Sequence, residues 1–224
     1  MIEIQLIESS SSSYLINDNG HLFMVDCGDG KIADIQKACE AFDKSLVDLE
    51  FIILTHAHCD HAENAAELKK LSNAKLIAHQ QAQKKLETGF APFPEGTTFY
   101  NKAIAFFLSI FSSDSGEFHP VKADLLVDDT FSLKNFGVNG SVHATPGHTA
   151  DSIIIILDKK YCFTGDTTFN HFPWTIYPMF ANNQKELNKS WDFIHDLPNI
   201  KTFYPGHGKP FPREKFLANY RRLS

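Results

Sequence analysis

The feature that most constrains this chain is residues 55–61, which read Thr-His-Ala-His-Cys-Asp-His. They follow a short apolar run over residues 51–54, which is typical of a fully buried strand. Imidazole and carboxylate groups are ligands that zinc and iron accept. Four such groups cannot share one face of a helix or strand at this spacing: His56, His58, Asp60 and His61. We therefore expect a tight loop at the strand's C-terminal end, arranged around two adjacent metal ions.

Composition limits the class of protein. The chain has 224 residues, 43% of them hydrophobic, which is enough for a sizeable core, and we expect a single domain over residues 1–224. A formal charge of −6 without a basic block argues against a nucleic-acid partner. The N-terminus lacks a signal-peptide pattern, and no apolar run is long enough to span a bilayer. We expect no membrane partner and a cytoplasmic location.

Hydrophobic periodicity and turn residues predict the order of the elements. Strands are expected at residues 2–8, 13–17, 21–26, 51–54, 75–78, 125–127, 130–133, 137–143, 152–157, 161–164 and 201–204. Helices are expected at residues 32–42, 62–71, 79–87, 184–197 and 213–222. Runs of strands with helices between them predict an α+β fold in which two sheets pack together and helices cover them.

A phenylalanine-rich segment interrupts this pattern at about residues 88–124. Its first part contains two prolines and two glycines and is not expected to be regular. Residues 99–111 then have helical spacing but are apolar almost all round. We expect a helical insert that forms either a pocket wall or the face of a homodimer, rather than ordinary core.

Three further polar residues follow predicted strands. His148 comes after Thr-Pro-Gly, Asp166 after Phe-Thr-Gly and His207 after Tyr-Pro-Gly. In each case a glycine allows the backbone to turn sharply as it leaves the sheet. Each of these patterns alone is weak evidence, but together with the His56 loop they strongly indicate a metal site.

The order His-x-His-x-Asp-His, Gly-His, Gly-Asp, Gly-His resembles the metallo-β-lactamase superfamily of hydrolases, in particular its glyoxalase II and lactonase-like branch. Asp26-Cys27-Gly28 looks like the first motif of that family, with cysteine in place of threonine. The resemblance runs from Ser12 to Phe211 and implies two mixed β-sheets packed face to face with helices outside, an αββα sandwich.

The resemblance also implies a ligand set. His56, His58 and His148 would hold one metal ion, Asp60, His61 and His207 a second, and Asp166 would bridge them. It implies two divalent ions, most naturally zinc, although these ligands also accept iron and manganese. Asp26 would position the loop without binding metal.

By the same analogy, the activity is hydrolysis of a small-molecule ester, thioester or lactone by a hydroxide shared between the metals. Asp60 is expected to handle the proton. His171 and Tyr177 follow the bridging Asp166 closely in sequence, so we expect them to lie near the metals and donate to the developing oxyanion.

Related classes fit this chain less well. Glyoxalase II has a further helical C-terminal domain, and the lactonases place a tyrosine where Phe169 stands. Phosphodiesterases of the superfamily that process tRNA need basic surfaces, and flavodiiron proteins have an acidic residue in place of His58. The alternatives that remain are a phosphodiesterase and a persulfide dioxygenase that binds a single iron through a subset of the ligands.

Overall fold

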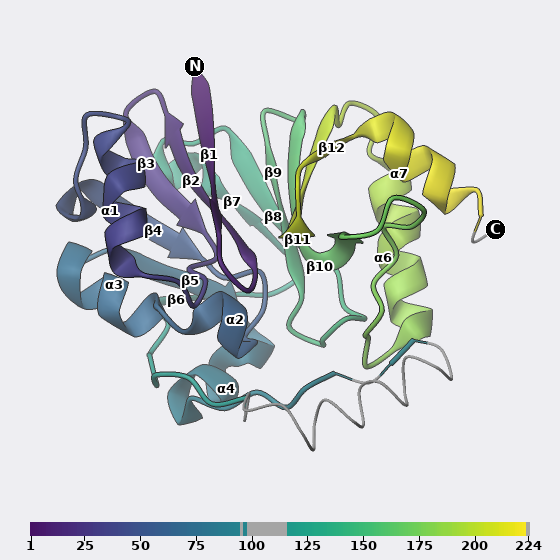
Figure 1. The fold of residues 1–224 in the computed structure, drawn as a ribbon, viewed down its shortest axis with the longest axis horizontal. Coiled ribbons are helices and arrows are strands. Elements are labelled where there is room, and N and C mark those ends of the chain that lie inside the picture. Colours follow the sequence, from purple (N-terminus) through teal and green to yellow (C-terminus); the bar gives the residue numbers. More distant parts are fainter. Residues whose placement is uncertain (95, 98–115, 223–224) are drawn as a thin grey trace.

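The computed structural model describes residues 1–94, 96–97 and 116–222. Two six-stranded sheets form the centre of the molecule (Figure 1). The first sheet has its strands in sequence order: β1 (Ile2–Glu8), β2 (Ser12–Asp18), β3 (His21–Val25), β4 (Leu49–Ile53), β5 (Lys75–His79) and β6 (Leu125–Val127). The second has the reverse order, from β12 to β7: β7 (Thr130–Ser132), β8 (Gly140–Ala144), β9 (Ile153–Leu157), β10 (Tyr161–Asn170), β11 (Thr202–Gly208) and β12 (Phe211–Pro212).

Both sheets are mixed, as expected. In the first, β1, β2 and β3 pair antiparallel, and β3 to β6 pair parallel. In the second, β10 and β11 are parallel neighbours, and the remaining pairs are antiparallel. The carboxyl ends of parallel strands lie at the same edge of a sheet, so the loops that follow these strands lie close together.

Helices cover the outer faces of the two sheets (Figure 1). On the first sheet lie α1 (Ile32–Glu40), α2 (Cys59–Ala62), α3 (Ala65–Ser72) and α4 (Gln83–Thr88), with the 3-10 turns η1 (Leu46–Asp48) and η2 (Gln80–Ala82). On the second lie α6 (Gln184–Asp196) and α7 (Arg213–Tyr220), and η3 (Leu133–Phe136) joins β7 to β8. Among the described residues, no helix has the length and apolar character needed to cross a membrane.

Alternating side chains of the central strands build three buried layers. Phe51 and Ile53 of β4 point between the sheets, whereas Ile52 packs under the helices of the first sheet. On β9 the apolar run is buried on both faces, with Ile153 between the sheets and Ile154 against α6 and α7. Continuous apolar runs are what strands covered on both sides require, and the predicted αββα sandwich is confirmed.

The structure differs from the sequence-based expectation in two places, and one expectation falls outside the described residues. Asp60 and His61 do not lie in a loop but on the one-turn helix α2. Strands β10 and β11 do not end before Asp166 and His207 but continue through them, because register shifts after Phe163 and Gly165 absorb the irregular backbone. The helix expected over residues 99–111, and with it most of the predicted pocket wall or dimer face, lies outside the described residues.

Candidate metal centre

A buried aspartate fixes the histidine-rich segment that follows β4. Asp26, at the end of β3, adopts the left-handed conformation with φ 58° and is 1% exposed. Its Oδ1 accepts the backbone N–H of Thr55 at 2.7 Å. Its Oδ2 accepts the Thr55 hydroxyl at 2.8 Å and lies 2.9 Å from Nδ1 of His61. One carboxylate therefore holds both ends of the segment from Thr55 to His61.

The second sheet supplies three side chains from separate segments. His148 follows β8, Asp166 lies within β10, and His207 lies within β11. The approach of β10 to β11 requires Gly206, because a Cβ at that position would lie 2.1 Å from Oδ1 of Asp166. Gly147 has φ 142° and lies against the backbone of Leu187 on α6, which leaves no room for a side chain before His148.

The predicted ligands form two groups. The first joins His56, His58 and His148 to Asp166. Nδ1 of His58 lies 2.9 Å from Nε2 of His56 and 3.2 Å from Nε2 of His148. Nε2 of His148 lies 3.3 Å from Oδ2 of Asp166. The facing atoms are therefore nitrogens and a carboxylate oxygen gathered around one point.

The second group consists of Asp60, His61 and His207. Oδ2 of Asp60 lies 3.3 Å from Nε2 of His207 and 3.6 Å from Nε2 of His61. Asp166 also reaches this group, with Oδ1 at 3.3 Å from Nε2 of His61 and Oδ2 at 3.3 Å from Nε2 of His207. Asp166 thus lies between the two groups, as a bridging ligand would.

The outer nitrogens of three imidazoles fix which nitrogen faces inward. Nδ1 of His61 can donate to Asp26, Nδ1 of His148 to the carbonyl of Phe180 at 2.9 Å, and Nδ1 of His56 to the Thr55 hydroxyl at 3.1 Å. These assignments follow from the hydrogen-bond network and leave the inward Nε2 lone pairs free to bind a metal. Within the described residues, Nε2 of His61 and Oδ1 of Asp166 are buried without a hydrogen-bond partner. Such orphaned atoms fit divalent metal ions.

The pKa values of the histidines shift in opposite directions in the two groups. Burial lowers the pKa of His58 to about 3, and burial likewise lowers the pKa values of His56 and His148. In the second group burial acts the same way, but Asp166 and Asp60 outweigh it and raise the pKa of His207 to about 10. Burial also lowers the pKa of His61, but Asp60, Asp166 and Asp26 outweigh it and hold that pKa well above its usual value.

A buried ion pair lies behind the first group and was not predicted from the sequence. The Asp151 side chain is fully buried, and its Oδ2 accepts the backbone N–H of Ala57, between His56 and His58, at 3.0 Å. Its Oδ1 pairs with the ammonium of Lys85 on α4. The only sequence signal was the position of Asp151 three residues after His148, and nothing in the sequence pointed to Lys85.

Five of the seven predicted ligands line a cavity of about 610 Å³: His58, Asp60, His148, Asp166 and His207. Its walls are largely aromatic and include Phe90, Phe93, Phe169 and Phe180. Phe90 and Phe93, from the start of the phenylalanine-rich segment, remain 47% and 43% exposed. A large apolar cavity over convergent polar groups is the usual form of a small-molecule site.

The two predicted oxyanion donors lie in different places. His171 lines the cavity, and its ring centroid is 5.7 Å from that of His207. Tyr177 does not line it. The Tyr177 hydroxyl donates to Oδ1 of Asn188 on α6 at 2.7 Å, and its ring packs against Trp191. In this geometry closeness to Asp166 in sequence does not bring the Tyr177 side chain to the predicted ligands, and its catalytic role remains a prediction.

Comparisons with known proteins agree with this geometry. The family model of the metallo-beta-lactamase superfamily matches residues 6–207. Glyoxylase B2 of Dictyostelium discoideum is 26% identical over 220 residues, which cover 98% of this chain and 70% of that protein. A hydroxyacylglutathione hydrolase of Shewanella loihica is 25% identical over 190 residues, covering 85% of this chain and 58% of that protein.

Among solved structures, the BLEG-1 B3 metallo-beta-lactamase superposes with a TM-score of 0.73 at 20% identity, and each chain is covered completely. That likeness establishes the fold. The family match over most of the chain, together with the histidine and aspartate groups, establishes membership. The chain belongs to the metallo-beta-lactamase superfamily and is a metal-dependent hydrolase of that family.

Proposed function

We propose that the chain is a dinuclear hydrolase of small-molecule esters, thioesters or lactones. The observation that carries this proposal is the position of Asp166 between two ligand groups at the base of an apolar cavity. His56, His58 and His148 would hold one ion, Asp60, His61 and His207 the other, and Asp166 both. The hydroxyacylglutathione hydrolase among its relatives supports an acyl substrate.

Bound divalent ions, most naturally zinc, would supply an activated water at neutral pH and polarise the substrate oxygen. The protein's own contribution is to orient the ligands and the substrate. Asp26 keeps the proton of His61 on Nδ1, away from the ligand group. Asp60 is partly exposed to the cavity, and it is placed to hold the proton released when water attacks.

The cavity walls would bind the acyl part of the substrate and exclude water. Phe93 and Phe180 stand edge to face with centroids 5.0 Å apart, which forms one side of an apolar slot. His171 also lines this cavity, and its imidazole is suited to donate to the oxygen that becomes negative.

The proposal is tested by removing the metals with a chelator and restoring zinc, iron or manganese one at a time. Each preparation is assayed on a panel of hexanoyl esters, thioesters, lactones and phosphodiesters. We expect turnover of one acyl class that disappears on chelation and returns with metal. Turnover of phosphodiesters alone would overturn the acyl assignment, and turnover that survives complete metal removal would overturn the metal mechanism.

His171→Leu provides a finer test, because leucine occupies a similar volume but has no hydrogen-bond donor. We expect a loss of about tenfold in kcat with little change in KM, as for one donor to a developing oxyanion in a partly open site. An equal fall in kcat for Phe172→Leu, its neighbour in the same segment, would indicate that the segment packs rather than donates.

A further inference from the structure

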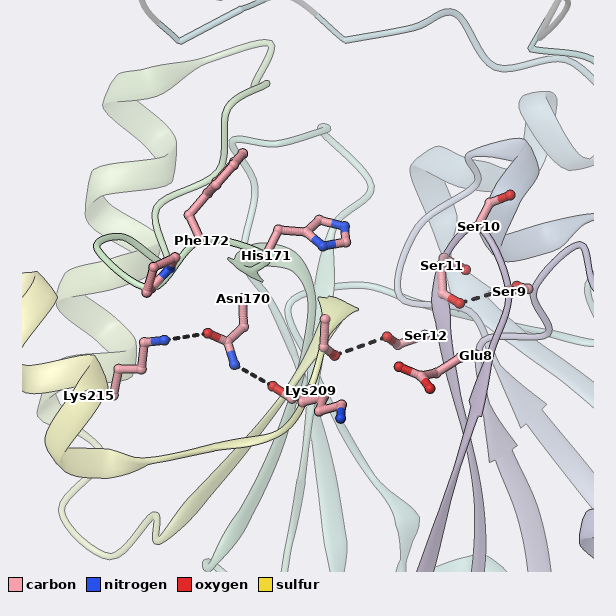
Figure 2. Close-up of a pocket in the computed structure, with 12 residues that line it drawn as sticks. Glu8, Ser9, Ser10, Ser11, Ser12, Asn170, His171, Phe172, Lys209 and Lys215 are labelled. Atoms are coloured by element: carbon pink, nitrogen blue, oxygen red, sulfur yellow. Dashed lines mark hydrogen bonds between the residues drawn. The ribbon is translucent and has the colours of Figure 1, made fainter.

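A second cavity, of about 510 Å³, lies beside the aromatic cavity that the predicted ligands line. Its lining is mostly polar. One wall is the serine-rich turn from Glu8 to Ser12 between β1 and β2. The other is formed by the ends of β10 and β11 and by Lys215 of α7. Figure 2 shows the two walls facing each other, with the His171 ring between them.

The walls of this polar cavity are attached to the metal-binding segments. The Ser11 hydroxyl donates to the backbone carbonyl of Asp60 at 2.6 Å. The Ser12 hydroxyl donates to the carbonyl of Gly208, next to His207, at 3.1 Å. A ligand held here would therefore sit at a fixed position relative to both predicted metal sites.

Cationic groups outnumber anionic ones in the lining. Lys209 and Lys215 contribute two ammonium groups, and Glu8 contributes the carboxylate. The Lys215 ammonium donates to Oδ1 of Asn170 at 2.6 Å, and Nδ2 of Asn170 donates to the carbonyl of Lys209 at 2.6 Å. This chain of contacts orders the lysine-bearing wall, and Lys215 retains two N–H groups for a ligand.

The two cavities meet along one edge. Ser10, His171 and Phe172 line both of them. A molecule that spans this edge would meet aromatic rings on one side, the metal ligands below and a cationic, hydroxyl-rich wall on the other. Its two ends must therefore differ, one apolar and one polar and anionic.

We infer that the polar cavity is a second subsite, which binds a carboxylate on the leaving group of the substrate through Lys209 and Lys215. This inference rests on the proposed function, because it assumes that the bond to be cleaved lies over the metal ligands. The substrate class becomes a thioester or ester with an apolar acyl group and a carboxylate-bearing thiol or alcohol. The carboxylate fixes the leaving group while the acyl chain fills the aromatic cavity.

Two pairs of probes isolate the carboxylate. The first pair is S-hexyl-N-acetylcysteine and its methyl ester, which differ by one negative charge and cannot be hydrolysed at the thioether. Their dissociation constants are measured by titration calorimetry on the metal-loaded protein. The second pair is the hexanoyl thioester of N-acetylcysteine and its methyl ester, assayed for kcat/KM.

For wild type we expect the acid to bind more tightly than the ester. In the variant Lys209→Met/Lys215→Met, we expect the Kd of the acid to rise about tenfold, as for two partly exposed charge-assisted contacts, and that of the ester to stay the same. Lys134→Met, on η3 and outside both cavities, should change neither. Glu8→Gln should lower the Kd of the acid, because it removes a negative charge that repels the carboxylate of the probe.

Two results would overturn the subsite: equal binding of acid and ester by wild type, or an equal loss of both in the double variant. Failure of the proposed function gives a different pattern. If neither thioester is hydrolysed but the calorimetric preference for the acid depends on the two lysines, the carboxylate-binding site stands and the proposed hydrolysis of thioesters falls.

Discussion

The two sheets contribute to the candidate metal centre in different ways. The first sheet supplies His56, His58, Asp60 and His61 from one continuous segment after β4. The second supplies His148, Asp166 and His207 from three segments far apart in sequence. The first contribution is a local motif held by a few buried carboxylates, whereas the second depends on the register of β10 against β11.

We call the contributions of the first and second sheets the first and second halves of the candidate centre. Each half depends on different side chains. In the first half, Asp26 and Asp151 each bind backbone N–H groups of the motif, so a single buried side chain controls several ligands. In the second half, Asp166 alone reaches both ligand groups. We therefore expect a substitution of Asp166 to act on both predicted metals, and a substitution of Asp26 to act mainly on the metal that His61 would hold.

The largest effect is expected for Asp166→Ala. The substitution removes the carboxylate that both ligand groups share, so at least one metal ion should be lost, with a fall of about 10³-fold or more in kcat/KM. Metal content and turnover are measured on the same preparation. Asp129→Ala, on the exposed turn before β7, is the control, and normal metal content in Asp166→Ala would contradict the bridging role.

A smaller effect is expected for Asp26→Asn. The asparagine amide would donate to Nδ1 of His61, which forces the His61 proton onto Nε2, the atom that faces the ligands. We expect affinity for the second metal to fall about 10- to 100-fold, measured by chelator competition.

Asp43→Asn is a matched control for Asp26→Asn, because Asp43 has the same left-handed backbone, with φ 55°, but is exposed. Equal loss of both metals in Asp26→Asn would remove the proposed distinction between the halves.

Lys85→Met tests the buried support of the first group. It leaves the Asp151 carboxylate without its ion pair but retains an apolar stem of similar length. Because the Lys85 side chain is 24% exposed, we expect the free energy of unfolding to fall by only about 2 kcal/mol, less than for a fully buried pair.

Denaturant titration measures that change in unfolding free energy. Lys84→Met, at the neighbouring and exposed position of α4, should be nearly neutral. If the two variants unfolded at the same denaturant concentration, the Asp151 ion pair would have no supporting role.

The smallest effect is expected for Tyr177→Phe. The hydroxyl is directed to Asn188, away from the cavity, so kcat should change by less than about twofold and only the bond to α6 should be lost. A fall in kcat comparable to that of His171→Leu would support Tyr177 as an oxyanion donor.

Much of the fold was predictable because its signals are local. The apolar run of β9 and the alternation in β1 to β3 identify strands without knowledge of their partners. The lengths of β10 and β11 were not predictable, since their extension through Asp166 and His207 depends on pairing between strands and on the irregular register there.

In the candidate site, too, features with local sequence signals were predictable and features that depend on packing were not. The seven predicted ligands lie together, because each lies within a strand or in the short segment that comes after one. Their assignment as ligands remains a prediction. The pairing of Lys85 with Asp151 and the turn of Tyr177 toward α6 depend on how helices pack on the sheets. The serine-rich turn from Glu8 to Ser12 forms a wall of the polar cavity, which no local sequence pattern indicated.

The most direct test is the number and identity of metal ions per chain in the purified protein, measured by elemental analysis together with turnover of an acyl substrate. The proposed centre predicts close to two divalent ions per chain and hydrolysis of an ester, thioester or lactone. A single iron per chain, with oxygen consumption on a persulfide and no hydrolysis, would contradict it.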